Sequence, residues 1–278
     1  DYVDLGSYNS YGLNDAMQSF TINLKTKTNT FSGSDPYIMG TPMFGGNNDR
    51  GFRIGIDSDD RYHVLVGGNS TAVGVSSNEK QIDTWYNITM VLDQGDQCGE
   101  CGGDSLFLYV DGVLEGVESI SPIGTINNAY NINLGAFVGQ WYGGPYNGSI
   151  DDVSIWSYAF NQQDVTNMNY VSLSGDEEGL LAYWDFNELH DDSGGNYAED
   201  LSVNGYNAYL HGATWVEDDS VSDVCCSDPE NDADNDGVCG DVDVCPGEDD
   251  NLDTDGDSII DCMEVSGCTD SNACNYND

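Results

Sequence analysis

Apolar and polar residues alternate through many short segments of the first 216 residues. In residues 19–25 the alternation places Phe20, Ile22 and Leu24 on one face and polar side chains on the other. A side-chain period of two suits a β-strand with one buried face. Further strand-like segments are residues 52–56, 62–66, 85–92, 106–110, 132–135, 150–156 and 180–186. The pattern predicts an all-β fold.

Turn-forming residues separate these segments. Asp111-Gly112 and Asn204-Gly205 are pairs typical of tight turns between antiparallel strands. One short helix is expected at residues 161–168, with Asn161 as its N-cap and Asp164 in its first turn. No alternation of strands with long helices is present, which argues against a doubly wound fold. We therefore expect two packed antiparallel sheets.

The charge balance excludes several classes of partner. The chain has 50 acidic residues against 6 Lys and Arg, a formal net charge of −44, and no Lys or Arg follows Lys80. A nucleic-acid-binding protein needs clustered cations, so no nucleic-acid partner is expected. No apolar run is long enough for direct membrane insertion. With 17 Tyr, 8 Phe and 5 Trp, the chain is too aromatic for a disordered polymer.

The sequence changes character after residue 216. Aromatic residues become rare, Asp and Cys become frequent, and apolar residues are too sparse to build a core. Such a segment orders only through cross-links or bound metal. We expect a sandwich domain in residues 1–216, a linker in 217–231, calcium-binding loops in 232–264 and the start of a Cys-containing module in 265–278.

Acidic residues of this tail recur at the spacing of a calcium-binding loop. Alternate residues of a tight loop point to one centre, so several oxygen ligands converge there, and a backbone carbonyl completes the set. The ligands predicted in the first loop are Asp232, Asp234, Asp236, Asp243 and the carbonyl of Val238. Those predicted in the second loop are Asp253, Asp255, Asp257, Asp261, Glu264 and the carbonyl of Ile259. The tail is therefore expected to bind two or more Ca²⁺ ions.

The same tail resembles the thrombospondin type 3 repeat at residues 236–239, 243–246 and 251–257. The resemblance implies a calcium-wrapped, disulfide-linked string with little hydrophobic core. It also implies two further calcium ligands, Asp241 and Asn251. The last residues, 267–277, resemble a short Cys-containing module common in secreted bacterial proteins.

Nine cysteines indicate an oxidising, extracellular location. Cys98 and Cys101 form a CxxC that we interpret as a local loop disulfide, because no second CxxC completes a zinc site. One candidate pairing in the tail joins Cys226 to Cys239, Cys245 to Cys262 and Cys268 to Cys274. The sequence leaves this connectivity open, and the odd count leaves one cysteine without a partner in the chain.

The first 216 residues resemble a laminin-G-like jelly roll of the concanavalin A type. The motifs that carry the resemblance are residues 1–6, 19–23, 85–89, 108–112, 148–156, 178–186, 200–202 and 212–215. The resemblance implies two antiparallel sheets whose curved face or rim loops bind glycans or proteins. In relatives an apolar strand precedes the first motif, so an unpaired sheet edge is expected here, which a second copy could fill in a homo-oligomer or fibre.

Candidate binding and modification sites are few. Trp141, Tyr142 and Tyr146 lie in a Gly-flanked loop and are candidate glycan contacts. Alternatively, Trp141 and Tyr142 close the end of the core. Asn69 and Asn147 stand in glycosylation sequons.

Catalysis is not expected, because the chain lacks the Glu-x-Asp-x-x-Glu run of jelly-roll glycosidases. The adjacent pair Asp151-Asp152 is not interpreted as catalytic, because acid–base work needs two carboxyl groups about 5–10 Å apart across a substrate. The resemblance implies a structural role for Asp151 at the start of a strand.

These observations favour a non-enzymatic extracellular module for adhesion or recognition, with a glycan or extracellular protein as ligand and a calcium-stiffened stalk. The first alternative is a structural subunit of an extracellular filament or surface coat. The second is a carbohydrate-binding domain of a larger glycosidase. The fold does not by itself decide between these functions.

Overall fold

The computed structural model describes residues 1–13, 19–30, 35–42, 51–69, 71–94, 104–121, 123, 126, 130–136, 144–168 and 173–216. Two compact units divide the chain, Asp1–Trp215 and Val216–Asp278. All described residues except Val216 belong to the first unit. The subdivision expected within residues 217–278 lies outside the described residues.

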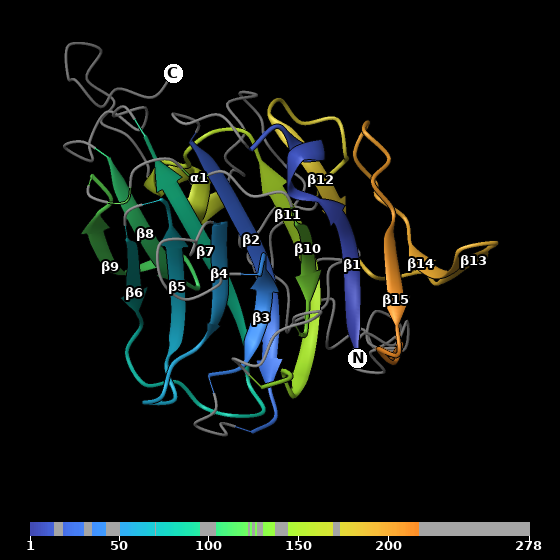
Figure 1. The fold of residues 1–278 in the computed structure, drawn as a ribbon, viewed down its shortest axis with the longest axis horizontal. Coiled ribbons are helices and arrows are strands. Elements are labelled where there is room, and N and C mark those ends of the chain that lie inside the picture. Colours follow the sequence, from blue (N-terminus) through green and yellow to red (C-terminus); the bar gives the residue numbers. More distant parts are fainter. Residues whose placement is uncertain are drawn as a thin grey trace, which may run out of the picture. The chain divides into compact units, whose positions relative to one another are not determined.

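Two antiparallel sheets make up the first unit (Figure 1). The nine-stranded sheet has the order β13-β14-β15-β1-β10-β3-β4-β5-β6. Its strands are β1 (Tyr2–Ser7), β3 (Tyr37–Gly40), β4 (Gly51–Ile56), β5 (Tyr62–Gly67), β6 (Ala72–Ser76), β10 (Asn131–Leu134), β13 (His190–Asp192), β14 (Gly195–Ala198) and β15 (Ala208–His211).

The six-stranded sheet has the order β12-β11-β2-β7-β8-β9. Its strands are β2 (Phe20–Thr28), β7 (Trp85–Asp93), β8 (Ser105–Val110), β9 (Val113–Ser119), β11 (Gly148–Trp156) and β12 (Leu180–Trp184). The predicted all-β sandwich of two antiparallel sheets is confirmed.

One continuous hydrophobic core lies between the sheets. Phe20, Ile22 and Leu24 of β2 are buried in it, as the alternation of residues 19–25 predicts. Phe52 and Trp184 are among the largest side chains that are completely buried there. Because the inner face of each strand faces this core, the charged side chains Lys25, Arg53 and Asp152 lie on the outer faces.

The predicted short helix is present as α1 (Gln162–Asn167). Asn161 caps it: the Asn161 side chain accepts from the Asp164 backbone N–H, and the Asp164 carboxylate accepts from the Asn161 N–H. Val165 belongs to a second apolar cluster that includes Phe107 and Trp156, on the outer side of the six-stranded sheet. A 3₁₀ helix, η1 (Tyr8–Tyr11), follows β1.

Within the described ranges, no helix is both long and apolar enough to cross a membrane.

The unpaired edge expected at the first strand is not observed. β1 pairs with β10 through Val3 and Leu134 and with β15 through Val3 and Leu210. The later strands β13–β15, which the sequence reading did not identify, extend the sheet beyond β1. The strands that end the two sheets are instead β6 and β13, and β9 and β12.

Side chains from a following loop cover the free edge of β12. The Asp200 carboxylate is buried and accepts from the backbone N–H groups of Tyr183 (2.9 Å), Ser202 (2.9 Å) and Tyr206 (2.7 Å). The Leu201 N–H donates to the Tyr183 carbonyl at 2.8 Å. The loop therefore takes the place of a further strand and satisfies the backbone of β12.

Replacing Asp200 by Ala should lower the free energy of unfolding by about 3 kcal/mol, because three buried N–H groups lose their shared acceptor. Urea unfolding followed by circular dichroism measures this change. Asp191 of β13 supplies the control. Asp191→Ala also deletes a carboxylate, but one that is exposed to solvent. Equal unfolding midpoints for the two variants would contradict this role of Asp200.

Candidate functional site

A β-bulge in β11 places two consecutive carboxylates on the outer side of the six-stranded sheet. Asp151 pairs with Lys25 of β2, but Ser154 pairs with Asn23, so β11 has one extra residue in between. Asp152 takes up the irregularity with a φ of 46°, a left-handed conformation that Asp tolerates better than most residues. Without the bulge, alternation would turn one of the two carboxylates toward the core.

Asp152 joins three strands through its two carboxylate oxygens. Lys25 Nζ of β2 lies 2.8 Å from Oδ2, and the Tyr183 hydroxyl of β12 donates to Oδ1 at 3.2 Å. Burial and the Asp152 charge raise the pKa of Tyr183, which therefore stays a hydroxyl donor. The Lys25 side chain is 45% exposed, so this ion pair contributes less than about 1 kcal/mol to stability.

Asp151 is the other half-buried member of the pair. Its Oδ1 accepts from the Asp152 backbone N–H at 3.0 Å. Burial, followed by the charge of Asp152, raises the pKa of Asp151 to about 7. Near neutral pH, Asp151 is thus present in both protonation states, and it can donate as well as accept a hydrogen bond.

A network of buried amide and hydroxyl groups supports the neighbouring strands. Asn23 Nδ2 donates to Asn87 Oδ1 and, at 2.7 Å, to Thr89 Oγ1. The Asn87 backbone N–H donates to Asp111 Oδ1 at 2.8 Å. These bonds fix the side chains of β2 and β7 and give the surface beside Asp151 a rigid base.

An aromatic ring completes the surface. Trp85 of β7 lies opposite Lys27 of β2, and Lys27 Nζ is 5.0 Å from the centre of the Trp85 ring. Both side chains are half-buried. We call the set the polar patch: its members are Lys25, Lys27, Trp85, Asn87, Asp151, Asp152 and Tyr183.

The polar patch has the chemistry of a binding site. It combines a half-exposed indole ring with ammonium, amide, carboxyl and phenol groups on the outer side of four strands. Such a mixture matches a ligand that has an apolar ring face and many hydroxyl groups. Asp151 and Asp152 are neighbours joined by a hydrogen bond, whereas glycosidases hold two carboxyl groups on either side of the bond they cleave.

The structure gives partial information on the sites named from the sequence. The Tyr146 ring packs against the core, and its hydroxyl lies 2.6 Å from Thr26 Oγ1 and 2.9 Å from Thr28 Oγ1. Trp141 and Tyr142 lie outside the described residues. Asn69 and Asn147 are exposed, and Asn147 Nδ2 donates to Thr30 Oγ1 at 3.2 Å.

The predicted calcium ligands between Asp232 and Glu264 also lie outside the described residues, as do all the cysteines. In the described residues no group of three or more His, Cys, Asp or Glu side chains is arranged to hold a metal ion. The tail loops therefore stay a prediction.

Sequence reasoning did not identify the polar patch. It gave Asp151 a structural role and treated Trp85 as part of a strand and of a motif shared with laminin-G-like domains. A signal was available, because two consecutive acidic residues between Ile150 and Val153 break the alternation of β11. That break indicates a bulge, and bulges often redirect side chains at functional sites.

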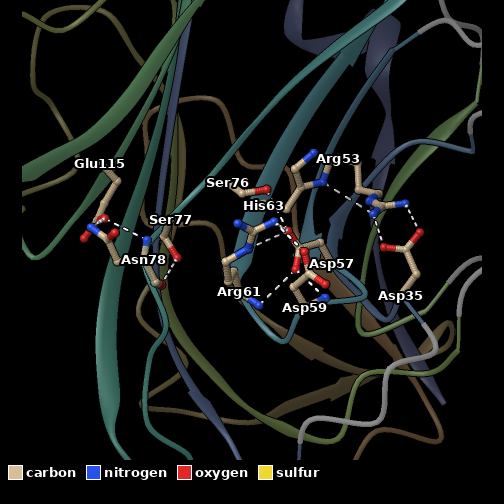
Figure 2. Close-up of polar contacts among 10 residues, drawn as sticks. All are labelled: Asp35, Arg53, Asp57, Asp59, Arg61, His63, Ser76, Ser77, Asn78 and Glu115. Carbon is tan, nitrogen blue, oxygen red and sulfur yellow. Dashed lines mark hydrogen bonds and ion pairs between the residues drawn. The ribbon is translucent and has the colours of Figure 1, made fainter.

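A second polar cluster, the charged ribbon, lies across β4, β5 and β6 (Figure 2). The Arg53 guanidinium is buried, forms two hydrogen bonds to Asp35 and lies 4.5 Å from the centre of the Tyr37 ring. Asp57 accepts from Arg61 Nη2 at 2.8 Å and from Ser76 Oγ at 2.7 Å. Arg53 is neutralised by Asp35, and Arg61 is neutralised by Asp57. We therefore interpret the charged ribbon as a feature that stabilises the fold.

His63 lies between the two halves of the charged ribbon (Figure 2). Burial and the nearby charge of Arg53 lower the pKa of His63 to about 4, so its ring is neutral at pH 7.

Glu115 lies on β9, the last strand of the six-stranded sheet. Its carboxylate accepts from the Asn78 N–H at 2.9 Å and binds Lys80 Nζ at 2.5 Å. These contacts tie the β6–β7 connection to strand β9.

The two packed antiparallel sheets define the class of the protein, an all-β sandwich. The Laminin_G_3 family model, described as the concanavalin A-like lectin/glucanases superfamily, matches residues 1–166. The chain belongs to this family. The likeness to a laminin-G-like jelly roll is therefore confirmed, whereas the likeness to thrombospondin type 3 repeats stays a prediction. A search of curated proteins found no match.

Solved structures show the same fold at low identity. A Bacteroides ovatus protein with a provisional carbohydrate-binding description is 18% identical with a TM-score of 0.59, over 77% of this chain and 56% of that one. The chain thus spans little more than half of that relative.

Two weaker likenesses have TM-scores below 0.5. The Ruminococcus gnavus sialidase module CBM40, bound to α2,6 sialyllactose, is 14% identical with a TM-score of 0.45, over 60% and 92% of the two chains. A Limulus polyphemus pentraxin is 16% identical with a TM-score of 0.43, over 60% and 74%.

Replacing Asp151 by Asn should stabilise the protein at pH 8. The folded-state pKa of Asp151, about 7, lies above its ordinary value of 3.8, so wild-type stability falls as the pH rises from about 4 to about 7. Asp151→Asn has no carboxyl group to ionise there, so its free energy of unfolding at pH 8 should exceed that of the wild type by about 2 kcal/mol. This value allows for the water that still reaches Asp151. Urea unfolding at several pH values measures the difference. Asp191→Asn is the control, and a gain independent of pH would contradict the assignment.

Proposed function

We propose that residues 1–216 form a non-catalytic carbohydrate-binding domain and that the polar patch holds the ligand. The observation that carries this proposal is the bulge in β11, which exposes Asp151 and Asp152 beside Lys25 and on the same face as Trp85. Membership of a lectin and glucanase superfamily and the provisional description of the Bacteroides ovatus relative support the same ligand class.

The roles of the side chains follow from their chemistry. The exposed part of the Trp85 ring offers an apolar surface for the C–H face of a sugar ring. Lys25, Lys27 and the carboxyl groups of β11 supply donors and acceptors for hydroxyl groups. The buried bonds of Asn23 and Asn87 hold the strands in place, so little order has to be gained when the ligand binds.

Replacing Trp85 by Ala should raise the dissociation constant for a bound glycan at least tenfold, because the ring surface is lost. A glycan array first identifies a ligand, and isothermal titration then measures the affinity. Lys27→Gln and Asp152→Asn are milder variants that should weaken binding and leave the core untouched. Tyr130→Ala removes a half-exposed aromatic side chain from the other sheet and is the matched control.

Two results would overturn this assignment. If no glycan binds the wild-type chain, the proposed function is wrong. If a glycan binds equally well to the wild type and to all three patch variants, the ligand site lies elsewhere.

We also propose that the tail is a calcium-stiffened, disulfide-linked stalk of an extracellular adhesion or recognition protein. The support is its sequence: tandem acidic loops, seven cysteines and no Lys or Arg after Lys80. The same module could be part of a larger glycosidase, which a glycosidase assay on the full-length gene product would reveal.

Chelation of calcium should increase hydrogen exchange in residues 232–264 and leave β2 and β7 protected, because only the tail depends on metal for order. Hydrogen exchange with mass spectrometry measures both regions in one experiment. Trypsin is unsuitable as a probe since it has no cleavage site after Lys80. Unchanged exchange in the tail would contradict the calcium loops.

A structural role in a filament or surface coat is the second candidate. It is favoured by β9, a seven-residue strand at the end of its sheet with exposed Val113 (63%), Leu114 (45%) and Val117 (47%). Electron microscopy of native material separates the two functions. Regular filaments would favour the structural role, and single particles would favour recognition.

A further inference from the structure

A row of aromatic rings crosses the outer side of the nine-stranded sheet at the β13 end. The strand register places His190 of β13 opposite Tyr197 of β14, and Tyr197 opposite Tyr209 of β15. Tyr2 of β1 lies opposite His211 of β15 on the same side of the sheet. We call the five residues, His190, Tyr197, Tyr209, Tyr2 and His211, the aromatic row. Figure 1 shows β13, β14 and β15 at the end of the molecule opposite β6 and β9.

The rings contact one another in two groups, one of His190, Tyr197 and Tyr209 and one of Tyr2 and His211. The ring centres are 5.4 Å apart for His190 and Tyr197, 5.6 Å for Tyr197 and Tyr209, and 4.6 Å for Tyr2 and His211. His211 is exposed and the other four side chains are half-exposed. Cross-strand aromatic pairs stabilise a sheet by about 0.2–1 kcal/mol each, which accounts for single pairs but not for an open row of five rings.

Carboxylates surround the aromatic row. Asp192 Oδ2 accepts from the Tyr209 hydroxyl at 3.1 Å, and this bond raises the pKa of Tyr209. Asp4 of β1 lies opposite Tyr209 on the side away from Tyr197. Glu188 and Glu199 each place a carboxylate oxygen 3.7 Å from His190 Nε2.

Among the described residues, every Lys and Arg has its partner elsewhere, and none is paired with these acids. β1 contains no Lys or Arg, and none follows Lys80 in the sequence. The two cation–π contacts among the described residues, Lys27 with Trp85 and Arg53 with Tyr37, both lie elsewhere. Aromatic rings bordered by carboxylates attract an ammonium group through the ring quadrupole and through Coulomb forces together.

We propose that the aromatic row is a second ligand-binding surface and that its ligand is a glycan with protonated amino sugars. The ammonium group would lie between the Tyr209 ring and the carboxylates of Asp4 and Asp192, with the sugar ring against the neighbouring rings. The sugar part of this inference rests on the proposed function, whereas the requirement for a cation rests on the aromatic row alone.

The test compares three probes that differ in one property each. The glucosamine tetramer carries ammonium groups, the N-acetylglucosamine tetramer carries none, and tetralysine carries ammonium groups without sugar. Isothermal titration uses the full chain with calcium at 150 mM salt, a concentration that screens attraction by distant charges. The glucosamine tetramer should bind at least tenfold more tightly than either of the other probes.

Matched variants separate this surface from general attraction to an acidic protein. The Tyr197→Leu, Tyr209→Leu double variant keeps every charge, so a tenfold loss of affinity identifies the rings. Tyr209→Phe keeps the ring and should bind as the wild type does. Asp192→Asn should weaken binding, whereas Glu118→Gln, which removes one exposed charge from β9, should not. Thermal unfolding checks each fold, and Asp192→Asn tests the surface even where the double variant is unstable.

Each outcome decides the inference. Equal binding of the two sugar tetramers overturns the need for a cation, and equal binding of tetralysine overturns the sugar. Glucosamine binding that the double variant and Asp192→Asn leave unchanged overturns the location. Trp85→Ala should leave the affinity for the glucosamine tetramer unchanged. A loss of affinity in this variant would instead assign the glucosamine tetramer to the polar patch. Failure of this inference and failure of the proposed function are therefore distinguishable.

Discussion

The core shared by the two sheets is the constraint on which the rest of the structure depends. Each long strand must turn one row of side chains inward, as β2 does with Phe20, Ile22 and Leu24. Because the period is two, the intervening residues necessarily face outward, and the strand register decides which of them meet. The polar patch, the charged ribbon and the aromatic row are all products of this arrangement.

The bulge in β11 shows how the same constraint creates an unusual electrostatic environment. An ionised carboxylate in the core would cost several kcal/mol, so a strand with two consecutive Asp residues cannot keep strict alternation. The extra residue brings both groups to the outer side, at the cost of a left-handed conformation at Asp152. Partial burial of Asp151, and then the charge of its neighbour Asp152, raise the pKa of Asp151. The bulge, which keeps a carboxylate out of the core, thus leaves Asp151 with a pKa near neutral pH.

Regular parts of the fold were readable from the sequence. The alternation around Ile22 predicted β2, and Asn161 with Asp164 predicted α1, because these signals are local. The strands β13 and β14 gave no such signal: His190–Asp192 is polar throughout, and Gly195 and Asn196 are poor strand formers. They form strands because β15 offers an edge to β14, and β14 in turn offers one to β13. Strand formation depends on such neighbours more than on intrinsic preference.

The candidate sites were harder to predict for the same reason. Trp85 and Lys27 are far apart in the sequence and meet only through the register of β2 and β7. Likewise, Tyr146 looked like part of an exposed loop, yet its hydroxyl reaches Thr26 and Thr28 on the inner side of β2. A residue's type and its neighbours in the sequence do not reveal which strand will lie beside it.

The Lys and Arg residues are distributed unevenly: all six lie in the first 80 residues, and the tail has none. Five of the six are described, and each has a partner: Lys25 with Asp152, Lys27 with Trp85, Arg53 with Asp35, Arg61 with Asp57 and Lys80 with Glu115. None of these contacts reaches the acids of β13–β15. Those acids therefore have no Lys or Arg partner among the described residues. Where loops would bring carboxylates to one point, as proposed for the tail, Ca²⁺ can supply positive charge. Where carboxylates are spread among aromatic rings, an organic ammonium group fits better, because it needs no convergent ligands and gains from contact with the ring faces.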